Sequence, residues 1–107
     1  MSLRVGAPTA TLPPMPAAPV FQTALGEAVK TRRQDLGLTQ EQVSLHSDLH
    51  QRWISNVETG KRNPSYASLR RLAAALQLST SDLIARAEAA EAQLAPRRGR
   101  AKVASGR

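Results

Sequence analysis

The sequence predicts an all-α protein, a compact bundle of about five short helices with an irregular arm before it and a basic tail after it. Apolar residues recur at i, i+3, i+4 and i+7 in several segments, which is the spacing of a buried helical face. No segment shows the alternation of apolar and polar residues that is typical of a strand. The chain has 107 residues, so one small domain with a limited core is expected.

Composition excludes several classes of protein. The chain has no cysteine, which excludes disulfides and thiolate metal sites and fits a reducing cytoplasm. No apolar run approaches the roughly 20 residues of a membrane span, and prolines interrupt any signal-peptide core near the N-terminus. No nucleophile–base pair, phosphate-binding glycine loop or pair of carboxylates stands out, so an enzyme is not expected.

The positive charge is unevenly placed along the chain. The formal net charge is +7. Residues 1–20 carry only Arg4, residues 21–90 carry nine basic and seven acidic side chains, and residues 91–107 carry five basic and one acidic. A basic balance favours nucleic acid or another anionic surface as the partner, although a basic tail can also be a merely solvated segment.

Residues 1–20 are predicted to be a disordered Pro/Ala-rich arm, and the folded domain is expected over residues 21–94. Five prolines in the arm each remove a backbone donor and fix φ, so a helix or a central strand is not expected there. Apolar residues at helical spacing then predict a first helix from Phe21 to about Asp35. Gly37 follows it, where a left-handed C-terminal cap is needed.

Residues 39–58 predict two short helices with a tight break between them. Thr39 and Gln42 have capping-box spacing, and the helix that they open should end near His46. Asp48 lies in the break, where aspartate tolerates the left-handed conformation better than most residues with a Cβ. The third helix, capped by His50 or Asp48, should continue to about residue 58.

The rest of the chain predicts a loop and two further helices. Residues 59–64 form a polar loop, and Ser65 is a plausible cap for a fourth helix. Ser79 with Asp82 opens a fifth helix, which Pro96 should stop. Residues 95–107 are expected to be a flexible basic tail. The apolar faces of the last two helices are Leu69, Leu72, Ala73 and Leu76, then Leu83, Ala87, Ala90 and Leu94.

Several motifs, spread over four helices and a loop, have the spacing of one known family. They are Leu25-Gly26, Val29, Arg33, Gly37-Leu38-Thr39-Gln40, Val43, Ile54-Ser55, Glu58-x-Gly60, Arg62-Asn63-Pro64-Ser65, Leu69 and Leu72-Ala73-x-x-Leu76. Over about residues 22–85 the chain resembles the phage-repressor-type helix-turn-helix family of lambda repressor and Cro, also called the XRE family. Residues 49–55 also resemble a subgroup that contains restriction–modification controller proteins.

The resemblance implies that the third helix enters the major groove of double-stranded DNA and that its exposed residues meet base edges. A glutamine or asparagine amide can bond adenine, and an arginine guanidinium can bond guanine. The alternative is an ordinary solvated helix face. The implied readers are Gln51, Arg52, Ser55 and Asn56.

The resemblance also implies residues that hold the DNA backbone and one structural ion pair. Contacts to phosphates set the register of the protein without reading sequence. The implied phosphate-binding residues are Thr39, Gln40, Lys61, Arg62 and Asn63. The implied ion pair joins Arg33 of the first helix to Glu58 at the end of the third.

Three positions depart from the family pattern. Asp48 stands where the family usually has glycine, Ser44 where it has alanine, and His50 where serine or threonine is commoner. Trp53 is expected to be partly buried rather than to lie against DNA. His46 and His50 are four residues apart, but the expected turn lies between them and no further ligand completes a set, so no metal and no cofactor are expected.

Several roles remain open within DNA binding. A transcriptional repressor is favoured, and an antitoxin with a toxin partner or a restriction–modification controller is the alternative. A cytoplasmic, bacterial or phage-encoded homodimer is expected, because such proteins read two half-sites about 34 Å apart. The stripe Leu83, Ala87, Ala90 and Leu94 is either the dimer interface or part of the domain core.

Overall fold

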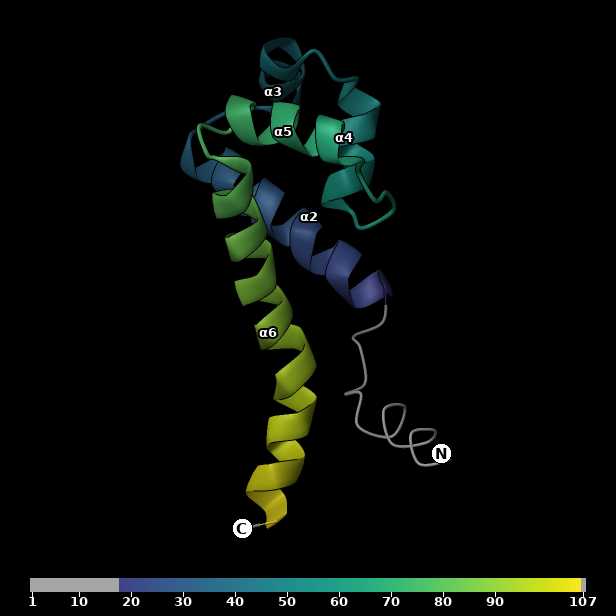
Figure 1. Cartoon of the computed structure of the whole chain (residues 1–107), viewed down its shortest axis with the longest axis vertical. Coiled ribbons are helices and arrows are strands. Elements are labelled where there is room, and N and C mark those ends of the chain that lie inside the picture. The colour runs from purple at the N-terminus through teal and green to yellow at the C-terminus, as the bar shows by residue number, and fades with distance from the viewer. Residues whose placement is uncertain (1–17, 107) are drawn as a thin grey trace, which may run out of the picture.

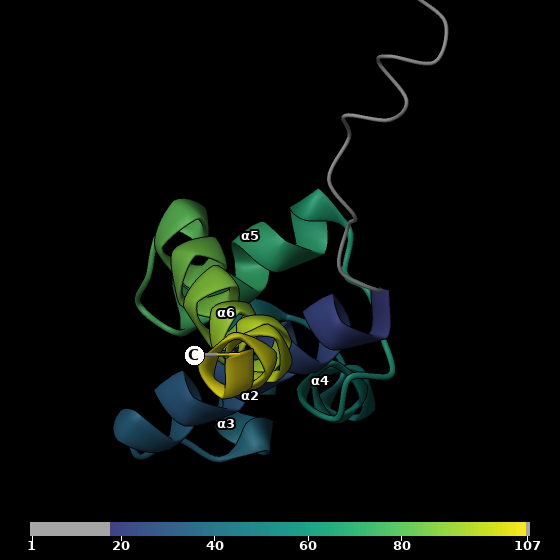
Figure 2. The same ribbon diagram turned by 90° about the horizontal axis from the view of Figure 1, so that it is seen from below.

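The computed structural model describes the backbone of residues 18–106 and the side chains of residues 20–94. Within this part of the chain all regular structure is helical, so the predicted all-α fold is confirmed. Figures 1 and 2 show α6 packed against α2 and extending away from α3, α4 and α5, which lie above α2 in Figure 1. The helices are α2 (Ala18–Asp35), α3 (Gln40–Ser47), α4 (Gln51–Glu58), α5 (Tyr66–Ala75) and α6 (Thr80–Gly106).

Helix α2 begins three residues earlier than the sequence predicted, at Ala18 rather than Phe21. Pro19 then lies in the first turn, where its missing N–H would have no partner inside the helix in any case. The helix ends as expected, with Gly37 at φ 71° and its N–H donating to the Gln34 carbonyl over 2.9 Å. Residues 1–17, which make up most of the predicted arm, lie outside the described residues.

The break between α3 and α4 adopts the predicted left-handed form. Asp48 has φ 60° and ψ 36°, and its N–H closes α3 by donating to the Ser44 carbonyl over 2.9 Å. The Ser44 hydroxyl donates to the Leu49 carbonyl and so ties the two sides of the break together. The serine that replaces the family's usual alanine therefore stabilises the turn that the aspartate makes.

The two helices of this unit are capped differently. At α3 the capping box is present: the Gln42 N–H donates to Thr39 Oγ1 over 3.1 Å, and the Thr39 N–H donates to Gln42 Oε1 over 2.8 Å. At α4 the N-cap residue is His50, but no side chain makes a cap hydrogen bond there. Of the two expected capping residues, His50 therefore occupies the N-cap position, and it does so without a side-chain hydrogen bond. Burial of Ile54 and Val57 holds this helix instead, because removal of apolar surface from water outweighs a missing cap.

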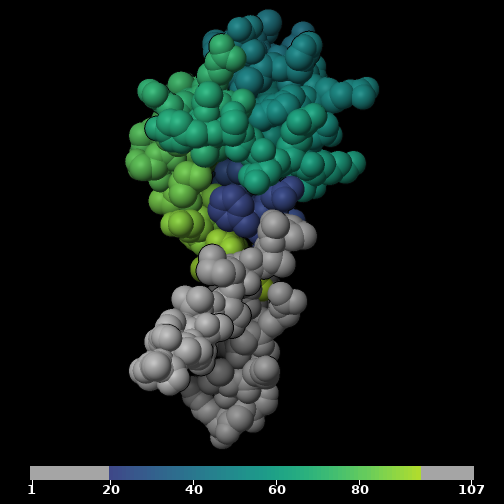
Figure 3. All heavy atoms as spheres, turned by 45° about the vertical axis from the view of Figure 1, so that its right-hand side comes forward, coloured from purple at the N-terminus to yellow at the C-terminus, as the bar shows by residue number. Residues whose placement is uncertain are grey.

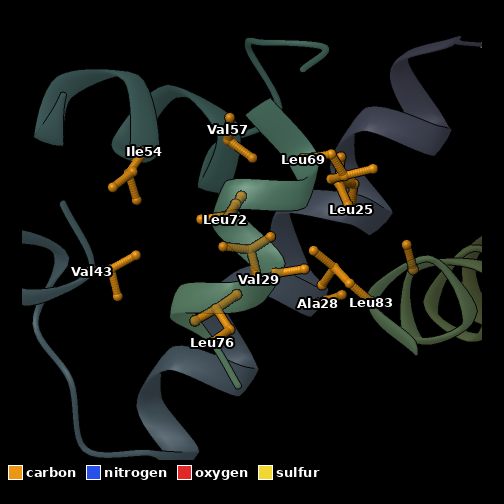
Figure 4. Packing of buried hydrophobic residues seen from close by; sticks show 12 residues of the cluster. Leu25, Ala28, Val29, Val43, Ile54, Val57, Leu69, Leu72, Leu76 and Leu83 are labelled. Carbon is orange, nitrogen blue, oxygen red and sulfur yellow. The ribbon is translucent and has the colours of Figure 1, made fainter. Parts of the chain in front are cut away.

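The core is a cluster of buried apolar side chains that lies between the helices (Figure 4). Trp53 and Leu49 pack against it from partly buried positions, so the partial burial expected of Trp53 is confirmed. Every helix contributes to the core, which explains how a small domain holds its helices at fixed angles. The largest fully buried side chains are Leu25, Val29, Val43, Ile54, Val57, Leu72, Leu76 and Leu83.

The structure places half of the apolar stripe of α6 in the domain core, and the helix ends later than predicted. Leu83 and Ala87 are fully buried in the domain core, whereas Ala90 and Leu94 are partly exposed. The helix then continues past Pro96 to Gly106, so the predicted stop at Pro96 was wrong. One proline removes one backbone hydrogen bond, but the alanines and arginines around it are strong helix formers. No helix within residues 18–106 has the length and hydrophobicity needed to cross a membrane.

Candidate nucleic-acid interface

Helix α4 presents a polar face to solvent because its apolar face is fixed in the core. Ile54 and Val57 have no exposed surface. Gln51 and Arg52 at the start of the helix are exposed, and one turn later Ser55 and Asn56 are half-buried. Residues four apart lie on one helix face. The four predicted base-reading residues therefore form two adjacent rows on the side of α4 that faces away from the core.

The loop after α4 folds back onto the end of that helix. Gly60 has φ 78°, a conformation that favours glycine. The Lys61 N–H donates to the Asn56 carbonyl over 2.8 Å, and the Gly60 N–H donates to the Val57 carbonyl over 3.0 Å. Lys61, Arg62 and Asn63 are all exposed. The structure thus brings two cations and an amide beside the last turn of α4.

The Arg33–Glu58 pair is present and nearly buried. Arg33 Nε donates to Glu58 Oε2 over 2.6 Å and Arg33 Nη2 donates to Glu58 Oε1 over 3.0 Å. The side chains are only 13% and 3% exposed. Arg33 Nη1 also donates to the Leu38 carbonyl over 2.9 Å. The pair therefore joins α2, the loop before α3 and the last residue of α4.

This pairing also keeps the arginine charged. The hydrogen bond to Glu58 raises the pKa of Arg33 above its usual value, burial opposes that rise, and the attraction of the carboxylate charge adds to it. A raised pKa in the folded state stabilises the fold at any pH below the unfolded-state pKa, and this contribution is lost only as pH rises through the folded-state pKa. Because arginine is fully protonated at neutral pH even without this rise, the pair should not weaken near neutrality through loss of the arginine proton.

Gln40 has a partner that the sequence did not reveal. Its Nε2 donates to Glu58 Oε1 over 2.9 Å, so the Glu58 carboxylate accepts hydrogen bonds from two residues. An amide has two donor hydrogens and one acceptor oxygen, and this bond uses one of those hydrogens. Gln40 lies half-buried at the first turn of α3, and Thr39 beside it is exposed. A residue predicted to hold a phosphate is thus also tied to the end of the recognition helix.

Gly26 is a second residue whose role the sequence pattern did not show. A Cβ at this position would lie 2.5 Å from the Val57 carbonyl oxygen and 2.6 Å from that of Glu58. Helices α2 and α4 therefore touch backbone to backbone at the end of α4. An isolated glycine within a predicted helix is the signal that indicates such a contact.

His46 and His50 are both exposed, one before and one after the left-handed Asp48. Within the described residues no group of three or more histidine, cysteine, aspartate or glutamate side chains is arranged to hold a metal ion.

The recognition face, the loop and the turn together define a helix-turn-helix DNA-binding domain. The sequence profile of the family described as "Helix-turn-helix domain" matches residues 24–87, which span α2 to α5 and the first turns of α6. The chain belongs to this family and is a helix-turn-helix transcriptional regulator of the lambda repressor and Cro type, not an enzyme.

Two curated relatives share about half of the chain. One is the uncharacterised HTH-type transcriptional regulator y4dJ of Sinorhizobium fredii, with 42% identity over 52 residues, which are 49% of this chain and 68% of that protein. The other is the control protein C.MunI of Mycoplasma sp, with 35% identity over 54 residues, which are 50% of this chain and 73% of that protein.

Solved structures have the same fold. The clp gene regulator ClgR of Corynebacterium glutamicum is 28% identical, with a TM-score of 0.72, and the match covers 84% of this chain and 93% of that one. The restriction–modification controller protein C.Esp1396I, solved as a tetramer with its natural 35-base-pair operator, is 24% identical with a TM-score of 0.62. That match covers 66% of this chain and 93% of the controller chain.

Proposed function

We propose that this regulator is a repressor that places α4 in the major groove of its operator. The observation that carries the proposal is the polar face of α4, held outward by the burial of Ile54 and Val57. Its amide and guanidinium groups match the hydrogen-bonding patterns of adenine and guanine. In this proposal the base-reading residues are Gln51, Arg52, Ser55 and Asn56.

When α4 lies in the major groove, the predicted phosphate-binding residues would lie next to the DNA backbone. Lys61, Arg62 and Asn63 are exposed beside the last turn of α4, where cations can reach the DNA backbone. Gln40 and Thr39 lie at the start of α3, where the positive end of the helix dipole favours an anion. Contacts of this kind position the protein on the duplex. The two groups of residues would thus contact the DNA backbone from the start of α3 and from the loop after α4.

Selection of duplexes from a random DNA pool by the wild-type protein tests this function. With the selected duplex, Arg52→Ala should weaken binding by about 1–3 kcal/mol and relax the preference at one position. Lys61→Ala should weaken binding to all sequences equally and lower the salt slope by about one. Both residues are exposed, so neither substitution should change the melting temperature. An unaltered sequence preference in Arg52→Ala would remove base reading from this face of α4.

A homodimer that reads two half-sites is part of the proposal. Leu83 and Ala87 are occupied by the domain core, which leaves Ala90 and Leu94 as the partly exposed end of the stripe on α6. Light scattering of Leu94→Glu beside the wild-type protein tests this interface. We expect a dimeric mass for the wild type and a monomeric mass for the variant. Equal masses for both would place the interface elsewhere.

The second candidate role is that of a restriction–modification controller or an antitoxin. The identity to the control protein C.MunI favours the controller, and an antitoxin would bind a toxin as well as DNA. In each of these roles, we propose, the protein is encoded by a bacterium or a phage and binds nucleoid DNA in the cytoplasm. The identity of the adjacent gene distinguishes them: a restriction enzyme, a toxin or neither.

A further inference from the structure

One side chain of α2 reaches the loop that follows the recognition helix. Gln22 Nε2 donates to the Gly60 carbonyl oxygen over 3.1 Å, although the two residues are 38 positions apart. Gln22 is half-buried. The contact lies next to the crossing at Gly26, so the N-terminal half of α2 supports both the end of α4 and the loop beyond it.

The hydrogen bond fixes one end of a single peptide group. The Gly60 carbonyl and the Lys61 N–H belong to the same planar unit. The carbonyl accepts from Gln22, and the N–H donates to the Asn56 carbonyl over 2.8 Å. A peptide plane that is held at both ends cannot rotate freely. The direction in which the chain leaves it, toward Lys61 and the exposed residues after it, is therefore set by these two bonds.

The backbone of α2 restricts the same loop from one side. A Cβ at Gly60 would lie 3.2 Å from Thr23 Oγ1 and 3.3 Å from Thr23 Cα. The loop therefore rests directly on the first turns of α2. Gln22 adds a side-chain hydrogen bond that orients the loop across this contact.

We propose that Gln22 is a positioning residue for the DNA-backbone contacts of Lys61, Arg62 and Asn63. It does not touch DNA in this proposal. It orients the peptide group from which these side chains start, so that their charges meet phosphates when α4 is in the groove. The inference rests on the proposed function, because the phosphate contacts that Gln22 would position are themselves part of that proposal. Gln22 itself lies outside the DNA-binding surface.

Two substitutions of Gln22 and one control measure this role. Gln22→Met keeps the length of the side chain and removes the donor, and Gln22→Ala removes both. Gln34→Ala, at an exposed position of the same helix, is the matched control. Binding is measured over a range of salt concentrations with the duplex selected by the wild-type protein and with one duplex of unrelated sequence.

We expect Gln22→Met to lose about fivefold in affinity for both duplexes, which is the scale of one hydrogen bond. The slope of log K against log salt should become shallower, because fewer phosphate contacts release fewer counterions. Gln22→Met should keep the preferred sequence of the wild type. Gln34→Ala should keep the affinity and the salt slope of the wild type. Gln22→Ala should show the same losses. Because Gln22→Met keeps the packing, it decides the outcome if Gln22→Ala lowers the melting temperature.

A double-mutant comparison separates positioning from general stability. In a Lys61→Ala/Arg62→Ala background, Gln22→Met should cause little further loss, because both charged side chains that it positions are gone and only Asn63 remains. A full fivefold loss in that background, or wild-type affinity and salt slope for Gln22→Met alone, would overturn the proposal. If the wild type selects no sequence from the pool, the proposed operator function fails. The unrelated duplex still tests Gln22 in that case, through the salt slope.

Discussion

Gly26 lies so close to Val57 that a Cβ on the glycine would stand 2.5 Å from the valine carbonyl oxygen. Real side chains do not tolerate this separation, and the obstructing atom belongs to the backbone of α4. The crossing of α2 and α4 is therefore set by main-chain contact. The angle of the recognition helix depends on one residue that has no side chain.

Gly26→Ala should destabilise the domain by roughly 1–3 kcal/mol through overpacking. The direction of the change in stability is informative. Alanine is a better helix former than glycine and would stabilise an uncrowded position by up to about 1 kcal/mol. Thermal unfolding of the variant measures the change. Glu27→Ala, at the adjacent exposed position, is the control and should keep the wild-type melting temperature. A higher melting temperature for Gly26→Ala would contradict the close crossing.

Glu58→Ala should lower both the melting temperature and the affinity for DNA. The substitution leaves the Arg33 guanidinium, which is 13% exposed, without its carboxylate, and Gln40 without its acceptor. Stranding a buried charge in this way costs about 3–5 kcal/mol, and the residual exposure of Arg33 favours the lower value. Calorimetry beside Glu88→Ala, which removes an exposed carboxylate, measures the effect. A melting temperature equal to that of the wild type would mean that the pair contributes nothing to the fold.

Asp48→Gly should stabilise the protein. Asp48 holds φ 60°, a conformation that costs a residue with a Cβ about 1–2 kcal/mol, less for aspartate. Its ion pair with Arg71 spans 3.9 Å and is largely exposed, so losing it should matter little. We expect a melting temperature a few degrees higher in Asp48→Gly and nearly unchanged in Asp48→Asn, since asparagine also tolerates this conformation. A lower value for the glycine variant would assign Asp48 a stabilising contact.

Deletion of residues 97–107 should reduce the salt dependence of DNA binding. The segment carries five cations, so the slope of log K against log salt should fall by at most about 4.5. The preferred sequence should not change, because such contacts are made to phosphates. Binding measured at several salt concentrations with selected and unrelated duplexes checks both statements. An altered sequence preference would show that the tail also reads bases.

Local chemistry made much of the fold predictable from the sequence. The capping box at Thr39 and Gln42, the left-handed Gly37 and the apolar spacing of α5 each involve residues a few positions apart. The end of α6 was not predictable, because Pro96 disfavours a helix while the residues around it favour one. Spacing identified the stripe on α6 but not its partner, and the fold was needed to assign Leu83 to the core.

The polar contacts that orient the candidate site were the least predictable. Gln40 meets Glu58 from 18 residues away and Gln22 meets Gly60 from 38 residues away. No periodicity connects such positions, because each contact exists only after the helices have packed. The Arg33–Glu58 pair was expected through the family resemblance, and nothing in the spacing of these two residues indicated it.

The shortness of α4 limits how much information one copy of the domain can extract from DNA. Eight residues correspond to about 12 Å of helix, and base pairs are stacked about 3.4 Å apart, so α4 spans about four of them. Any four-base-pair sequence recurs by chance about once in 250 positions, while a genome offers about a million or more competing sites. One such helix can recognise a short sequence but cannot specify a unique operator. A unique operator requires several short sequences that are read together at a fixed spacing.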